Sequence, residues 1–175
     1  SGVSVSLSND GNTVAIGAES NGYNFTGHVR IYNFDGTYWN QLGGDIDGED
    51  EFNYSGVSVS LASDGQRVAI GAPGNSGTGG YESGHVRIYN FDGTYWNQLG
   101  DDIDGEASSD FSGCSVSLSG GGDTVAIGAM FHDGNATNSG HVRIYIWDGS
   151  SWIQLGNDIE GSLNYQQIGE SVSIS

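Results

Sequence analysis

The sequence predicts an all-β fold, a β-propeller assembled from four-stranded antiparallel blades, and three observations support this prediction. A six-residue stretch, Gly-His-Val-Arg-Ile-Tyr, occurs three times, at 27–32, 84–89 and 140–145. The glycines that open each copy recur about every 55 residues, a period typical of propeller blades, at Gly2, Gly56, Gly113 and Gly169. The 31 Gly and the single Pro fit many tight turns, while helix signals are rare.

The repeat also predicts where each blade begins and ends. We expect a first blade at 1–54, a second at 55–111, a third at 112–167 and the first strand of a fourth at 168–175. Three blades cannot close a ring, because propellers have roughly four to eight. We therefore expect the chain to be part of a longer polypeptide with further repeats, or copies of the chain to associate and complete the ring.

The first two strands of each copy are predicted by alternating side chains. In residues 3–7, Val and Leu alternate with Ser, so one face is bulky and the other is small. Residues 14–18 repeat the pattern, with Val and Ile opposite Ala and Gly. Two unlike faces without strong charge suit a sheet held between neighbours, the bulky face of one copy on the small face of the next.

The third and fourth strands are predicted on either side of a tight turn. The third strand is the six-residue stretch itself, with Val29 and Ile31 on one face and His28 and Arg30 on the other. The Asp-Gly pair that follows it in every copy favours a type I′ hairpin turn. We expect the fourth strand at 38–42 in the first copy, followed by an acidic connection to the next copy.

The loops before the third strand are where the copies differ most, in length and in sequence, at 19–26, 73–83 and 130–139. Alternate connections of an antiparallel meander emerge at the same end, so these loops are expected to share one face. Variable loops on a rigid scaffold commonly carry recognition. The candidate ligand contacts are the loop aromatics that have no equivalent in other copies, together with the one His outside the repeat: Tyr23, Phe25, Tyr81, Phe131 and His132.

On these motifs the chain resembles, over its whole length, the FG-GAP repeats that form the blades of integrin α-subunit type propellers. The matching residues are Ser-Gly-Val-Ser-Val-Ser-Leu at 55–61, Val-Ala-Ile-Gly-Ala-Pro at 68–73 and the six-residue stretch at 84–89. The resemblance implies a four-stranded blade, a ring of roughly seven blades, an extracellular or cell-surface setting and ligand binding through the loops of one face.

Many members of this family carry an Asp-rich calcium loop between the first two strands, and here the sequence departs from them. Each copy has one carboxylate in that turn, fewer than the oxygen ligands that Ca²⁺ takes, so we expect no calcium there. Ca²⁺ is the one cofactor that the sequence suggests, and its better candidate ligands lie in the acidic connections: Asp45, Asp47, Asp102, Asp104, Asp158 and Glu160. The alternative is a solvated acidic rim that attracts cations without a specific site.

Three residue types recur at framework positions, and we predict structural roles for them. The histidines lie on different blades, on the order of 10 Å apart, too far to share one zinc ion: His28, His85 and His141. Each arginine is expected to hold a carboxylate, at Arg30, Arg87 and Arg143, with Asp47, Asp104 and Glu160 as the expected partners. The tryptophans are expected in the blade core, with sugar stacking as the alternative: Trp39, Trp96 and Trp152.

Composition restricts the partners. The formal charge is −18, from 22 acidic residues against four arginines and no lysine, which excludes nucleic acid and anionic membranes as electrostatic partners. No apolar run is long enough to span a membrane. The single cysteine, Cys114, takes the place of Val3 and Val57 and is predicted to act as a small buried hydrophobe.

Together these features favour a non-enzymatic, extracellular structural or adhesion module that presents its loops to a protein or glycan within a larger assembly. The alternative is a calcium-dependent, lectin-like propeller that binds carbohydrate. Sequons at Asn24, Asn53 and Asn135 would carry glycans in a secreted protein. A propeller hydrolase is a third hypothesis, but no nucleophile elbow and no copy-specific acidic pair indicates catalysis.

Overall fold

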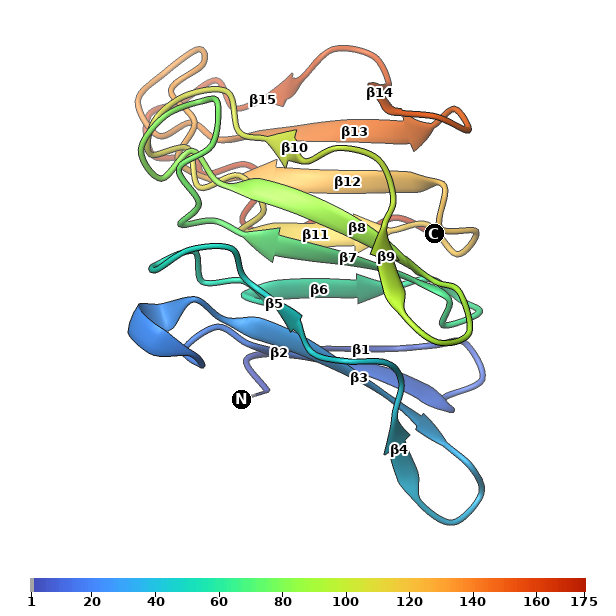
Figure 1. Ribbon diagram of the computed structural model, residues 1–175. Helices are drawn as coiled ribbons and strands as arrows, with labels where there is room; N and C mark the ends of the chain where they lie inside the picture. The colour runs from blue at the N-terminus through green and yellow to red at the C-terminus, as the bar shows by residue number, and fades with distance from the viewer. Residues whose placement is uncertain (1) are drawn as a thin grey trace.

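The computed structural model describes residues 2–175, in which three antiparallel sheets stack one on another (Figure 1). Blade 1 consists of β1 (Ser4–Leu7), β2 (Thr13–Ala18), β3 (His28–Phe34), β4 (Trp39–Gln41) and β5 (Ile46–Asp47). Blade 2 consists of β6 (Ser58–Leu61), β7 (Arg67–Ala72), β8 (His85–Phe91), β9 (Trp96–Gln98) and β10 (Ile103–Asp104). Blade 3 consists of β11 (Ser115–Leu118), β12 (Thr124–Ala129), β13 (His141–Trp147), β14 (Trp152–Gln154) and β15 (Ile159–Glu160). The predicted all-β class is confirmed, and the open stack fits an incomplete propeller.

Helical structure is minimal. Within residues 2–175 the one helical segment is the short 3₁₀ turn η1 (Tyr23–Phe25), in the loop between β2 and β3. The described part of the chain contains no helix with the length and apolarity needed to cross a membrane.

The predicted fourth strand differs from the observed one. In place of a single strand at 38–42, two short strands, β4 and β5, pair with the same edge of β3. The chain bulges between them at Gly43, whose φ of 66° favours glycine, and Leu42 still donates its N–H to the carbonyl of Ile31 at 2.8 Å. The acidic segment therefore returns to the sheet, and Asp47 lies opposite His28 in the register.

The blades pack with unlike faces together, as the alternating pattern predicts. Between blades 1 and 2, the bulky side chains of Val59, Leu61 and Ile70 are buried against Ala15 and Val29. Between blades 2 and 3, an equivalent cluster joins Val116, Leu118, Val125 and Ile127 to Ala69, Val86 and Ile88. The core thus lies between sheets and not within any one of them.

Serine hydroxyls and glycines hold the small face against its neighbour. Ser4 donates its Oγ–H to the carbonyl of Gly56 at 2.7 Å, and Ser6 Oγ accepts the N–H of Leu61 at 2.9 Å. A Cβ placed on Gly17 would collide with the same Gly56 carbonyl, so only glycine permits this approach. The contacts recur at the second junction, where Ser58 reaches Gly113 at 2.7 Å.

The two ends of the stack are uncovered by the residues that the structure describes. Val5 and Leu7 of β1 are 57% and 56% exposed, although their equivalents Val59 and Leu61 are buried. At the other end, Ile159 is 53% exposed, whereas Ile103 is 5% exposed. Each end therefore offers a face that another blade covers elsewhere in the stack.

The last segment docks on blade 3 in the manner of a first strand, although the structure assigns no strand to residues 170–175. Ser115 donates its Oγ–H to the carbonyl of Gly169 at 2.6 Å, and Ile174 donates its N–H to Ser117 Oγ at 3.1 Å. These bonds are equivalent to those of Ser4 and Ser6 at the first junction. A strand is assigned only when a second strand pairs with it, and the described residues provide none there.

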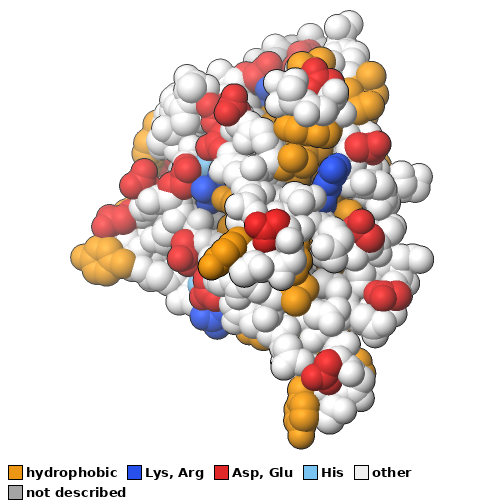
Figure 2. Space-filling view, turned by 45° about the vertical axis from the view of Figure 1, so that its right-hand side comes forward, with side chains coloured by type: hydrophobic (Ala, Val, Ile, Leu, Met, Phe, Trp, Pro, Cys, Tyr) orange, Lys and Arg blue, Asp and Glu red, His pale blue; other side chains and the backbone are white. Residues whose placement is uncertain are grey.

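Connections of one kind gather at one end of the stack. The loops from the second to the third strand and the connections between blades lie together on the left of Figure 1, and the tight hairpins lie on the right. In the space-filling view, acidic side chains are scattered over the visible face and basic ones are few (Figure 2). The loop end therefore gathers the segments in which the copies differ most.

The close approach of the blades predicts the effect of adding a methyl group. In a Gly71→Ala variant, the new Cβ meets the carbonyl of Gly113 and the hydroxyl of Ser58, so we expect a loss of roughly 1–3 kcal/mol in unfolding free energy. Chemical denaturation measures this change in unfolding free energy. Gly44→Ala is the matched control, because a Cβ there has open space; equal stability of the two variants would contradict the packing described.

Candidate functional site

A backbone ladder at the loop end connects each blade to the next. In the first copy, the N–H groups of Phe52, Tyr54 and Ser55 bind the carbonyls of Asn24, Phe25 and Thr26 at 2.8, 3.1 and 3.1 Å. The same ladder joins Ser109 to Tyr81 at 2.8 Å in the second copy, and Tyr165 to Thr137 at 2.8 Å in the third. Each variable loop is thereby fixed to the connection that follows it.

The ladder requires an unusual backbone conformation in every copy. Equivalent positions have positive φ whatever the side chain: Phe25, Glu82 and Asn138; Phe52, Ser109 and Tyr165; and Tyr54, Phe111 and Gln167. Bulky residues at positive φ are uncommon and cost free energy, so the ladder must hold them there. The loops therefore form a rigid frame on which the side chains vary.

A pocket of about 330 Å³ opens between the loops of blades 1 and 2. We call it the loop pocket, and its lining consists of Glu51, Phe52, Tyr54, Gly74, Ser76, Tyr81 and Glu82. Tyr81 is 68% exposed and Phe52 is 48% exposed, so aromatic surface faces the solvent beside two carboxylates. The neighbouring Glu82 raises the pKa of the Tyr81 hydroxyl.

The structure separates the five residues predicted to contact a ligand. Tyr81 lines the loop pocket, and Phe25 packs beside it, 6.2 Å from the ring of Phe52. Tyr23 is exposed on η1. Phe131 packs edge-on against Phe111, and His132 binds Asp110, both at the junction of blades 2 and 3.

Sequence reasoning missed six residues of the loop pocket: Glu51, Phe52, Tyr54, Gly74, Ser76 and Glu82. Glu51, Phe52 and Tyr54 belong to the connection between blades, and Glu82 belongs to a variable loop. The signal in the sequence is the aromatic pair Phe52 and Tyr54 in the connection after the first copy. The equivalent residues after the second copy are Ser109 and Phe111.

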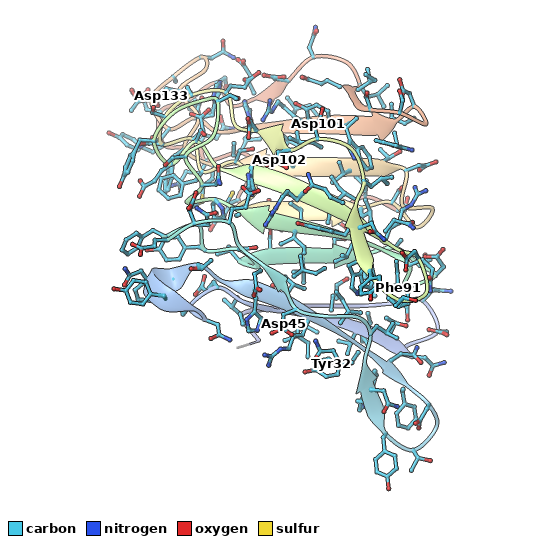
Figure 3. The ribbon with its side chains drawn as sticks, viewed as in Figure 1. Tyr32, Asp45, Phe91, Asp101, Asp102 and Asp133 are labelled. Atoms are coloured by element: carbon cyan, nitrogen blue, oxygen red, sulfur yellow. The ribbon has the colours of Figure 1, made fainter. Side chains whose placement is uncertain are left out.

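The six carboxylates predicted as calcium ligands lie on three blades, and of these Asp45 and Asp47 come together beside His28. Asp45 and Asp102 lie at equivalent places on successive blades (Figure 3). A bidentate hydrogen bond from Arg30, at 2.9 and 2.7 Å, holds Asp45 and lowers its pKa to about 2. Asp102 and Asp158 each accept the amide of a Gln on the preceding strand, and Asp104 accepts the hydroxyl of Thr78 at 2.6 Å. Calcium binding by these residues, with Asp47 and Glu160, stays a prediction.

The arginines reach partners other than those expected. Arg87 crosses to blade 1, where it binds the carbonyl of Asp47 at 2.9 Å and the carboxylate of Glu49 at 3.2 Å. Arg143 crosses to blade 2 in the same way, binding the Asp104 carbonyl at 2.7 Å and Glu106 at 3.5 Å. Arg30, in blade 1, binds Asp45 of its own blade instead of Asp47. The expected pairing with Asp104 and Glu160 is wrong because both side chains extend across the junction, out of their own sheets.

The histidines and tryptophans of the repeat also lie at the junctions. His85 is 1% exposed, with Nδ1 3.3 Å from Asp102, and burial followed by the charge of Arg87 lowers its pKa. His28 contacts Asn21 at 3.0 Å. Trp96 and Trp152 donate their Nε1–H groups to the carbonyls of Leu42 and Leu99 in the preceding blades, at 2.9 and 2.8 Å, whereas Trp39 is 48% exposed.

The sequons differ in accessibility. Asn53 is 3% exposed, and its Oδ1 accepts the N–H of Asp50 and the side-chain amide of Asn75. Asn135 is exposed and Asn24 is partly exposed. Cys114 is partly buried beside the carbonyl of Gly169, and burial raises the pKa of its thiol.

The buried His85 predicts a specific dependence of stability on pH. An unfolded chain binds a proton at this residue near pH 6.5, while the folded protein resists it because its pKa is lowered. Stability should therefore fall as pH drops below 6.5. We expect a flatter slope in that range for His85→Gln, measured by thermal melting between pH 8 and about pH 5. Parallel slopes for the variant and the wild type would contradict the burial of a neutral imidazole.

Solved structures of known proteins share this fold. A proposed 6-phosphogluconolactonase from Bacteroides fragilis aligns with a TM-score of 0.61 at 13% identity, over 90% of this chain and 38% of that one. Hydrazine synthase from Kuenenia stuttgartiensis aligns at 0.56 and 11%, over 93% and 36%. A proposed 6-phosphogluconolactonase from Bacteroides uniformis aligns at 0.55 and 10%, over 91% and 40%. This chain spans less than half the length of each, and at these identities the likeness shows the fold alone.

No curated protein matches the sequence. The profile of the FG-GAP repeat family matches residues 103–145, from β10 through the six-residue stretch in β13. The other two copies carry the same strands, turns and junction residues. The match shows an FG-GAP repeat at 103–145, and the other two copies are similar to it in their motifs.

Proposed function

We propose that this protein is a non-enzymatic, extracellular structural or adhesion module whose loop end binds a partner. The observation that supports the proposal is the loop pocket, where exposed aromatic rings and two carboxylates stand on a rigid backbone ladder. An extracellular setting agrees with the usual setting of FG-GAP repeats. The lactonase and hydrazine synthase names belong to the structural neighbours and carry no activity over to this chain.

The chemistry of the loop pocket favours a cationic group. Tyr81 and Phe52 offer ring faces that attract a lysine or arginine side chain, and Glu51 and Glu82 stand beside them. The charge of −18 over the whole chain would draw such a partner from a distance. We therefore propose a basic segment of another protein as the partner, in preference to a glycan. The predicted calcium-dependent lectin gains no support from carboxylates that already accept hydrogen bonds.

The exposed ends of the stack support a role within a larger assembly. One end presents the bulky residues of β1, and the other presents the part of the small face of blade 3 that residues 169–175 leave uncovered, with Ile159. The two ends have the complementary character of the junctions inside the stack. We propose that further blades cover them, from the same polypeptide or from another copy of the chain.

Partner binding can be tested with a lysine-rich peptide and a panel of neutral oligosaccharides, measured by calorimetry. We expect the peptide to bind, more weakly at high salt, and Tyr81→Ala to lower its affinity about tenfold, since a cation–π contact contributes roughly 1–2 kcal/mol. Tyr95→Ala is the matched control, because Tyr95 is 66% exposed at the opposite, hairpin end. Equal losses in both variants would contradict the loop pocket as the site, and binding of oligosaccharides alone would favour a glycan partner.

Assembly through the end faces predicts association of the isolated chain. We expect its light-scattering mass to rise with concentration, because the exposed bulky face of β1 is apolar and association would bury it. A Val5→Ser, Leu7→Ser double variant should shift the mass toward the monomer. Tyr38→Ser, at an equally exposed hairpin residue, should leave the mass of the wild type unchanged. A wild-type chain that stays monomeric at all concentrations would contradict association between copies and leave further blades of the same polypeptide to cover the ends.

A further inference from the structure

The third copy carries a different residue type from the other two at one equivalent position of the repeat. Asn21, Asn75 and His132 follow the second strands of blades 1, 2 and 3. Each donates its N–H to the last alanine of that strand, at 3.0, 3.1 and 3.2 Å, and accepts the N–H of the glycine before the third strand. Because the backbone is the same, the change from Asn to His alters only the side chain.

The partner of this position changes with it. At the junction of blades 1 and 2, Asn75 donates to Asn53 at 3.3 Å. At the junction of blades 2 and 3, Asp110 takes the place of Asn53, and its carboxylate lies 2.9 Å from Nδ1 of His132. Asp110 is 2% exposed, so this is a buried His–carboxylate pair. The other ring nitrogen of His132, Nε2, takes no part in this pair.

His132 stands beside a second histidine and further carboxylates. The rings of His132 and His141 lie 4.0 Å apart, and both present a ring nitrogen within 4.8 Å of a carboxylate oxygen of Glu106. Nδ1 of His141 lies 3.6 Å from Asp158 and 3.9 Å from Glu106. These separations are near the value of about 3.4 Å between the ligands of a tetrahedral zinc with bonds of about 2.1 Å. Figure 3 labels Asp133, the residue after His132, at this end of blade 3.

His141 points independently to a missing ligand. Its side chain is 1% exposed, and its Nδ1 is buried without a hydrogen-bond partner, although it faces the two carboxylates. A buried polar atom without a partner costs free energy, and a metal ion would remove that cost.

We propose that His132, His141 and Glu106, with Asp158 beside them, form a site for a divalent transition metal such as zinc at the junction of blades 2 and 3. Two imidazoles and a carboxylate suit Zn²⁺ and poorly suit Ca²⁺, which takes oxygen ligands. Asp110 orients His132 in the manner of a carboxylate–histidine–zinc arrangement, and Arg143 holds the other oxygen of Glu106 at 3.5 Å. The ion would join the loop of blade 3 to the connection from blade 2.

The first junction explains why the sequence alone did not suggest this site. It has the equivalent Glu49, His85 and Asp102, but Asn75 in place of a second imidazole. The recurring histidines lie on different blades, too far apart to share an ion. The relevant pair consists of one recurring histidine and the one histidine outside the repeat. The site is separate from the loop pocket and does not depend on the proposed function.

Calorimetric titration with Zn²⁺, in the presence of excess Ca²⁺, tests the proposal. We expect saturable binding of one Zn²⁺ per wild-type chain, and an affinity at least about tenfold lower in His132→Asn, which installs the residue of the second copy and should fold normally. Co²⁺ provides a spectroscopic check through the absorption of a tetrahedral complex. Thermal melting without metal verifies that the variant is folded.

An Asn53→Asp, Asn75→His double variant tests the same argument by gain of function, because it gives the first junction the donor set of the second. We expect the number of Zn²⁺ ions bound per chain to rise from one to two. The proposal is overturned if the wild type shows no saturable Zn²⁺ binding, or if His132→Asn binds Zn²⁺ as tightly as the wild type. Binding of Ca²⁺ in preference to Zn²⁺ at this junction would also overturn it.

Discussion

The structure depends on the close approach of a small sheet face to the bulky face of the next blade. Gly17 and Gly71 allow the backbone of the neighbouring blade to come nearer than any side chain would permit, and serines bond to the backbone that arrives there. Isolated sheets of this size have no core of their own, because nearly every fully buried apolar residue faces another sheet. Stability is therefore a property of junctions, as in other repeat proteins.

The same junctions reduce the repulsion among acidic side chains, which would otherwise oppose folding. With only four arginines against 22 acids, the chain places Arg87 and Arg143 in buried positions that cross between blades. Each binds a backbone carbonyl and a glutamate of the preceding blade and lies over a tyrosine ring. A buried arginine is tolerated when its charge is paired and its donors find acceptors. The acidic connection supplies a carboxylate and a backbone carbonyl to each, while Nε of Arg143 is left without a partner among the described residues. The acidic segments thus have a structural role as well as a surface one.

The loop end combines a constant backbone with variable side chains. The positive-φ ladder recurs in all three copies, yet its side chains change from phenylalanine to glutamate to asparagine at one position. A frame fixed by backbone hydrogen bonds lets side chains change without altering the fold. The loop pocket arises in the first copy and the His–His–Glu cluster in the third, so equivalent places on the frame carry different chemistry.

The sequence by itself determined the fold class and the repeat. It also determined the position of the first three strands and the pairing of bulky with small faces, because alternating side chains show which side of a strand is buried. It did not show the split of the fourth strand, because the bulge at Gly43 depends on how Ile46 returns to pair with Val29. Only the tertiary structure decided the partners of the arginines, since those bonds join residues about 40 positions apart across a junction. It also decided which aromatics form a pocket and which histidines meet. His132 and His141 are nine residues apart in a loop and a strand, and only the folded loop places their rings together.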